Sequence, residues 1–152
     1  MVKFLFVRFR LLTKLLLPIW LCFALLSGCQ RIVYRYSFSH DISSVQKVEI
    51  CAYDYKTETG TIIKTLTAEE QKSIYADIQD LKCYKWFGDH ATGFGAVIVY
   101  ITYADGGAEI VGPVNTAWVD ASGNWDLTAY YFDNEPFYEM ISKYAVVENW
   151  KK

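Results

Sequence analysis

Two histidine–aspartate pairs are the residues of this chain that could support acid–base or metal chemistry. They occur as "HD" at residues 40–41 and "DH" at residues 89–90, and the sequence has no other histidine. A histidine beside a carboxylate can act as a general base, and Asp89 and His90 with one further acid could hold a metal ion. Neither pair lies in an H-E-x-x-H pattern, and neighbouring residues of a strand point to opposite faces. We interpret both pairs as polar turn residues and predict no metal site. Asp89 and His90 remain the weak catalytic candidates of an alternative, a small envelope hydrolase or metal-dependent enzyme.

Other patterns typical of enzymes and of nucleic-acid binders are missing from the sequence. "GFG" at residues 93–95 precedes an expected strand, whereas a phosphate-binding loop opens a helix. No serine lies in a G-x-S-x-G pattern. Residues 1–28 hold four basic residues and no acid, which leaves 11 basic and 17 acidic residues, a net charge of −6, in residues 29–152. Because such a surface repels phosphate backbones, we predict no nucleic-acid partner. Because the sequence holds no complete catalytic or cofactor-binding pattern, we also predict no catalytic role and no cofactor beyond a covalent lipid.

Aromatic residues are the unusual feature of residues 29–152, which hold 4 Trp, 12 Tyr and 5 Phe. Trp118 and Trp125 flank the turn "VDASGN", and Tyr130 and Tyr131 follow on a strand with their side chains on opposite faces. Tyr and Trp combine a large apolar area with a polar tip, so one face could present them to a sugar or a protein partner. The alternative is that they fill a thin core between a sheet and helices.

The four cysteines have different expected roles. Cys22 lies in an N-terminal apolar segment, and Cys29 directly follows that segment. Cys51 and Cys83 are a candidate disulfide that would close a loop of 31 residues, worth roughly 3 to 4 kcal/mol on the chain-entropy model. The alternative is two buried free thiols, because both cysteines lie in strand-like runs.

The N-terminus has the three parts of an export signal. A basic segment, residues 1–14, precedes an uncharged segment and then "LSGC" at residues 26–29. The 14 uncharged residues from Leu15 to Gly28 would make a helix of about 21 Å, short of the ~30 Å hydrocarbon core of a bilayer. A cleaved signal peptide over residues 1–28 therefore fits better than an uncleaved membrane helix, which would place Arg8, Arg10 and Lys14 in or near the apolar zone.

"LSGC" resembles the lipobox of bacterial lipoproteins, with leucine, two small residues and then cysteine. The resemblance implies that Cys29 receives a diacylglyceryl group, with acyl chains such as palmitate, and becomes the N-terminus after cleavage. Two acyl chains anchor a protein to a membrane far better than one. Residues 29–152 also resemble the small uncharacterised lipoproteins of Gram-positive gut bacteria in "KVEI", "KTLTAEE", "LKCYKWFGDH", "VYITYADG" and "YYFDNEPFYEMISKY". That resemblance implies no particular activity.

Periodicity predicts the elements that position these residues. Thr67 and Glu70 form a capping-box pattern, and Ile74, Ile78 and Leu81 follow at helical spacing, which predicts a helix over about 68–80. A second helix is predicted over about 135–144. Strands are expected near residues 32–38, 45–55, 62–66, 81–87, 96–104, 108–111, 116–120 and 125–132.

The turn "DGG" after the strand at residues 96–104 sets a register prediction. If Asp105 and Gly106 form a two-residue loop, Ile101 faces Ile110 and Thr102 faces Glu109 across the hairpin. Glu109 is then expected on the side of the sheet opposite to Ile101.

We therefore predict a mainly antiparallel α+β protein with two helices and one folded domain. The expected division is a signal peptide (1–28), a lipidated N-terminus with a short tether and a first strand (29–44), and the α+β domain (45–152). The predicted location is the extracytoplasmic face of the cell membrane, where the protein is held by its lipid anchor. The predicted function is a binding module for an unknown protein or glycan. Besides the enzyme noted above, the alternative is a structural envelope protein or inhibitor that acts through a sheet edge.

Overall fold

The computed structural model describes residues 32–54, 56–57, 59–85, 93–127 and 130–147. The chain divides into two units, Met1–Ile32 and Val33–Lys152. The second unit contains both hydrophobic clusters of the described residues, so it has a core of its own. The predicted signal peptide and Cys29 lie outside the described residues. Within the described ranges, no helix is both long enough and apolar enough to cross a membrane.

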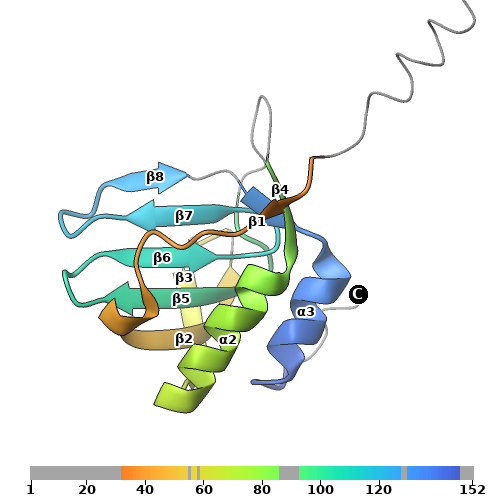
Figure 1. The fold of residues 1–152 in the computed structure, drawn as a ribbon, viewed down its shortest axis with the longest axis horizontal. Coiled ribbons are helices and arrows are strands. Elements are labelled where there is room, and N and C mark those ends of the chain that lie inside the picture. Colours follow the sequence, from red (N-terminus) through yellow and green to blue (C-terminus); the bar gives the residue numbers. More distant parts are fainter. Residues whose placement is uncertain (1–31, 55, 58, 86–92, 128–129, 148–152) are drawn as a thin grey trace, which may run out of the picture. The chain divides into compact units, whose positions relative to one another are not determined.

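Two antiparallel sheets form the framework (Figure 1). The large sheet has the strand order β3-β2-β5-β6-β7-β8. Its strands are β2 (Val45–Asp54), β3 (Thr59–Thr65), β5 (Val97–Tyr103), β6 (Ala108–Val111), β7 (Thr116–Val119) and β8 (Trp125–Leu127). The small sheet has the order β1-β4-β9, with β1 (Tyr34–Arg35), β4 (Lys82–Lys85) and β9 (Tyr130–Phe132). The single strand expected over residues 125–132 is thus two strands, one in each sheet.

Among the described residues, two α-helices and one short 3-10 helix complete the fold. The capping box predicts the start of α2 (Ala68–Asp80) correctly, because the Thr67 hydroxyl accepts from the Glu70 N–H while the Glu70 carboxylate accepts from the Thr67 N–H. The second helix, α3 (Asn134–Ser142), lies within two residues of its predicted bounds. A 3-10 turn, η1 (Ile42–Ser44), leads from the N-terminal segment into β2. The structure confirms the predicted α+β class with two helices.

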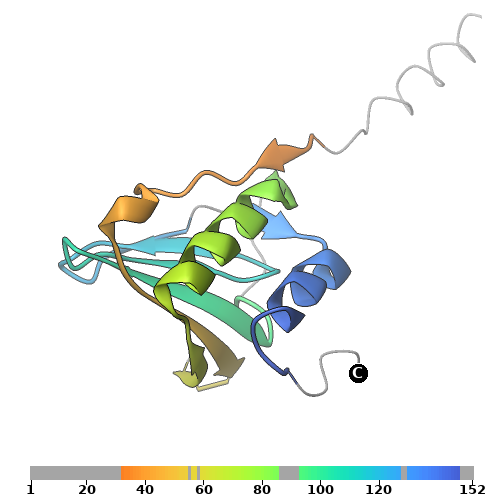
Figure 2. The same cartoon turned by 60° about the horizontal axis from the view of Figure 1, so that its bottom comes forward.

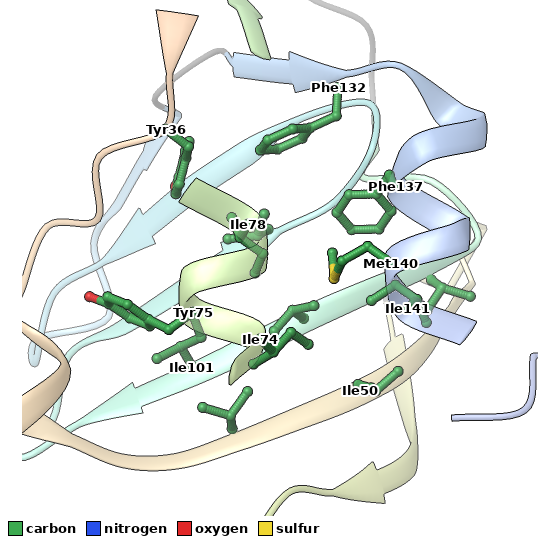
Figure 3. Packing of buried hydrophobic residues seen from close by; sticks show 14 of the residues in the cluster. Tyr36, Ile50, Ile74, Tyr75, Ile78, Ile101, Phe132, Phe137, Met140 and Ile141 are labelled. Atoms are coloured by element: carbon green, nitrogen blue, oxygen red, sulfur yellow. The ribbon is translucent and has the colours of Figure 1, made fainter. Parts of the chain in front are cut away.

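Both helices pack on the same face of the large sheet (Figures 1 and 2). Figure 3 shows Ile74 and Ile78 of α2 and Phe137 of α3 turned toward the sheet. They meet sheet residues such as Ile50 and Ile101, all with no exposed surface. Burying a side chain of this size contributes about 1.5 to 3 kcal/mol, so this helix-covered face is the main core.

The hairpin between β5 and β6 differs from its predicted register by one residue. Ile101 pairs with Glu109, and Tyr100 pairs with Ile110. The reason lies in the turn, where the Gly107 carbonyl accepts from the Tyr103 N–H at 2.9 Å and Gly106 has a φ of +88°. The loop therefore has three residues rather than two, with glycine in the left-handed position that such loops require. A slip of one residue moves every side chain of β6 to the other face, so Glu109 lies on the helix-covered face.

Candidate functional site

The large sheet has one side on which no helix of the described ranges packs, and this side contains a groove of about 310 Å³. Strand alternation creates it, because every second side chain of β2 and β5 points away from the helices. Its lining consists of three isoleucines, three aromatic residues and three smaller or charged residues: Ile62, Ile98, Ile110, Tyr53, Tyr100, Trp125, Glu49, Cys51 and Gly60. We call this feature the helix-free groove. Six of its nine residues are isoleucine or aromatic, so it is suited to apolar groups.

Phe94 supports one side of the helix-free groove. It comes from the loop before β5, and its ring meets that of Tyr53 edge-on, with a centroid distance of 5.5 Å. On its other side it lies 6.2 Å from the ring of Trp125. Gly112 permits this arrangement, since a Cβ there would lie 2.1 Å from the Phe94 carbonyl oxygen. Phe94 is 6% exposed whereas Trp125 is 59% exposed, so the groove has a buried side and an open rim.

The charged group of the groove, Glu49, lies on β2. The Glu49 carboxylate is 3.1 Å from the Lys47 Nζ and accepts a hydrogen bond of 3.3 Å from the Thr65 hydroxyl. Burial, with the nearby charge of Glu49, raises the pKa of the Cys51 thiol to about 11. A thiol with so high a pKa stays protonated near neutral pH and is a poor nucleophile. The groove can therefore bind an apolar group but has no activated thiol.

A second cluster lies on the helix-covered face around Glu109, which is 2% exposed. Its carboxylate accepts hydrogen bonds from the hydroxyls of Tyr36, at 2.5 Å, and Tyr103, at 2.6 Å. It also accepts from Ser39, at 2.8 Å from the hydroxyl and 3.1 Å from the backbone N–H. Burial raises the pKa of Tyr103 well above its usual range, and the adjacent Glu109 raises it further. We call these residues the Glu109 cluster.

The residue His40 lies beside the Glu109 cluster. Its ring stacks on Tyr103 and Trp118, with centroid distances of 4.5 and 4.9 Å, and its Nε2 lies 3.0 Å from the Asp105 carboxylate. The Tyr75 hydroxyl donates to the His40 backbone carbonyl. Among the described residues, no buried side-chain nitrogen or oxygen lacks a hydrogen-bond partner, and no His, Cys, Asp and Glu side chains gather into a metal site. The hydrogen bonds of Tyr36 and Ser39 to Glu109 and the stacking of His40 on Tyr103 and Trp118 attach residues 36–40 to the large sheet.

The disulfide candidate is not formed, and the structure shows the alternative, two buried free thiols. Cys51 faces the helix-free side of β2 and packs with Phe94 and Ile98. Cys83 belongs to the main core, where its Sγ donates to the Tyr34 carbonyl at 3.3 Å. The two thiols lie in different clusters on different sheets, so they do not meet.

The four candidate binding aromatics do not form one platform. Trp118 lies on the helix-covered face, while Trp125 lies on the rim of the helix-free groove. Tyr130 packs against the main core, and Tyr131 stacks on Tyr84 of the small sheet. The prediction that Tyr130 and Tyr131 lie on opposite faces is confirmed. Core filling thus accounts for Trp118 and Tyr130, and only Trp125 contributes to the groove.

The remaining candidates lie outside the described residues. These are the lipidation candidate Cys29 and the weak catalytic candidates Asp89 and His90, so the enzyme alternative stays a prediction. The role of Glu109 could not be predicted from a two-residue turn, which places this side chain on the wrong face of the sheet. The groove was also not predicted, although the apolar residues on both faces of 96–104 indicate that the second face is covered or used.

Comparisons with known proteins extend this picture no further. No protein-family model, no curated protein and no solved structure matches the chain.

Proposed function

We propose that this chain is a lipid-anchored extracytoplasmic binding module that receives apolar side chains of a protein partner in the helix-free groove. The groove is the observation that carries the proposal. Its lining residue Ile62, on β3, is 55% exposed, and Leu127, which follows Trp125 on β8, adds a further apolar side chain that is 50% exposed. Contiguous apolar surface rimmed by polar residues is typical of interaction sites.

The chemistry of the groove favours a protein over a glycan. A sugar presents many hydroxyls, and a glycan site needs a matching set of hydrogen-bonding side chains. The groove offers the Glu49 carboxylate, two tyrosine hydroxyls and one indole N–H among nine lining residues. Glu49 already pairs with Lys47 and Thr65. Isoleucine and aromatic side chains dominate the rest, as they do at the centres of protein interfaces.

The lipid anchor is supported by the sequence alone. Its test is a Cys29→Ala variant of the full chain, expressed in the native host. We expect loss of acylation and of signal cleavage, measured by intact mass and membrane fractionation. Unchanged mass and fractionation would contradict the anchor.

The groove is tested by site-specific photo-cross-linking in cells that carry the full chain. A photoreactive residue at Ile62 samples the groove, and one at Val146, which is 86% exposed beyond the end of α3, is the matched control. We expect a discrete protein adduct from position 62 that is absent from position 146 and is weakened by Tyr100→Ala. The same adducts from both positions, or none from position 62, would contradict the assignment.

A second candidate function uses the edge strand β3. This strand forms one edge of the large sheet, and its Ile63 is 39% exposed. An exposed edge of seven residues is a template for an added strand, as in inhibitors and structural assemblies. Cross-linking from position 63 but not from position 125 would favour this candidate.

A further inference from the structure

The outer face of the small sheet has a composition of its own. In β1 and β4, Tyr34 pairs with Cys83 on the core side, so the neighbouring pair of Arg35 and Lys82 faces outward. In β4 and β9, Tyr84 pairs with Tyr131 on that same outer side, and their rings stack with centroids 5.3 Å apart. Two basic side chains and a tyrosine pair therefore share one surface, which we call the outer patch.

The charge of the small sheet opposes that of the chain as a whole. Its three strands contain Arg35, Lys82 and Lys85 and no acidic residue. Lys85 places its Nζ 5.9 Å from the ring of Tyr130. Two carboxylates flank the sheet: Asp133 accepts from the Tyr84 hydroxyl at 3.1 Å, and Asp80 ends α2. The strands are nevertheless a basic region in a chain whose residues 29–152 carry a net charge of −6.

The length of the tether places this basic region near the lipid anchor. Only residues 30–33 lie between Cys29 and the start of β1 at Tyr34. Four residues of extended chain span at most about 14 Å. Arg31 in this tether adds a further positive charge, and residues 29–40 contain no acid. If Cys29 holds two acyl chains, β1 cannot lie far from the headgroups of the membrane.

We propose that the outer patch docks on a membrane surface of anionic phospholipids and so fixes the orientation of the domain. Arg35 and Lys82 bind lipid phosphates, to which guanidinium and ammonium groups are complementary. The stacked tyrosines suit the headgroup region, where amphipathic rings accumulate. None of the residues of the helix-free groove belongs to this sheet. The inference rests on the lipid-anchor part of the proposed function and adds a second, protein-encoded membrane contact.

The test uses the chain from residue 30 onward, which lacks the lipid site but contains the whole compact unit that begins at Val33. Its sedimentation with vesicles of phosphatidylcholine is compared with that on vesicles containing phosphatidylglycerol as well, at low salt. We expect binding to the anionic vesicles only, and binding that weakens as salt is added. Replacing Arg35 and Lys82 with glutamine should weaken it by about fivefold for each residue.

The matched control replaces Lys56 and Lys72 with glutamine. Both are exposed, in the turn after β2 and in the N-terminal half of α2, and the change in net charge is the same. We expect near-unchanged binding, with circular dichroism showing that all variants are folded. Equal binding to neutral vesicles, or an equal loss in the control, would overturn the inference.

Failure of the outer patch to bind vesicles can be distinguished from failure of Cys29 to be acylated. The Cys29→Ala variant reports on acylation in cells, whereas the vesicle assay uses a chain without Cys29. Full acylation together with no vesicle binding would overturn the outer patch alone. Vesicle binding without acylation would overturn the anchor and leave a membrane-binding surface.

Discussion

Replacing Glu109 with glutamine tests a carboxylate that is 2% exposed and accepts several hydrogen bonds. The Glu109 carboxylate accepts four hydrogen bonds, two of them from hydroxyls of Tyr36 and Tyr103, which are 3% and 0% exposed. A glutamine side chain keeps one oxygen and replaces the other with an N–H₂ donor. Three of the four donors point to Oε2, so we expect the glutamine oxygen at that position and its N–H₂ group facing the Tyr36 hydroxyl, which loses its acceptor.

The expected loss of stability follows from these contacts. A buried hydroxyl without an acceptor costs about 1 to 3 kcal/mol, and a hydrogen bond to a neutral rather than a charged acceptor is about 1 kcal/mol weaker. Removing a buried charge offsets part of this loss, because its desolvation no longer has to be overcome. We expect Glu109→Gln to lower the free energy of unfolding by about 2 to 3 kcal/mol. Ser39 adds little, since its donors can reach water.

The assay is urea unfolding followed by fluorescence, with a double-mutant cycle. Tyr36→Phe alone should cost about 1 to 2 kcal/mol, because a hydrogen bond to the carboxylate is lost. In the Glu109→Gln background the same change should cost close to zero, giving a coupling free energy of about 1 to 2 kcal/mol. The control is Glu139→Gln on the exposed side of α3, which should change stability by less than about 0.5 kcal/mol.

Two results would refute this reasoning. One is a Glu109→Gln variant whose stability lies within about 0.5 kcal/mol of the parent, since a buried four-fold acceptor cannot be replaced at so small a cost. The other is strict additivity with Tyr36→Phe, which would mean that the two side chains do not interact.

Three further predictions concern the thiols and the start of α2. Burial raises the pKa of both Cys51 and Cys83 to about 11, so in the chain from residue 30 onward, whose cysteines are these two, we expect negligible reaction with a thiol reagent at pH 8. In urea we expect two reactive thiols, and no reactive thiol would reveal a disulfide. Removing the cap with Thr67→Ala should cost about 1 kcal/mol in urea unfolding, and an unchanged midpoint would contradict the capping box. The hydrogen bond from Lys64 lowers the pKa of Glu70 from 4.5 to about 2, so its stabilisation is complete above pH 4.5 and is lost as the pH falls toward 2. Acid titration of a Glu70→Gln variant should therefore show a shallower loss of stability over that window, and identical curves would exclude this contribution.

Local sequence rules predicted those elements whose signals are contained in a few neighbouring residues. The capping box at Thr67 and the apolar spacing of Ile74 and Ile78 determine where α2 begins and which side it buries. Alternation in the strands predicted the opposite placement of Tyr130 and Tyr131 for the same reason. The lipobox pattern at residues 26–29 is likewise local, and its prediction about membrane anchoring stands on the sequence alone.

Pairing between distant segments could not be predicted in this way. The partition of residues 125–132 into two sheets depends on contacts that the sequence does not display, such as the hydrogen bond from the Phe132 N–H to the Pro113 carbonyl at 2.8 Å. Whether Cys51 and Cys83 could meet depended on the sheet and face that each occupies. The outer patch also requires the register of β1, β4 and β9, which places Arg35 beside Lys82 and Tyr84 beside Tyr131.

The sequence by itself thus determined the α+β class and the two helices of the described residues, and it predicts a membrane address, because each depends on short-range periodicity or on a short motif. The tertiary structure decided which side chains share a face. One additional loop residue between Tyr103 and Gly107 moves Glu109 from the predicted side, opposite to Ile101, to the same side as Ile101 in the core. Side chains alternate along a strand, so a shift of a single residue exchanges the two faces, and only the folded chain shows which shift is present.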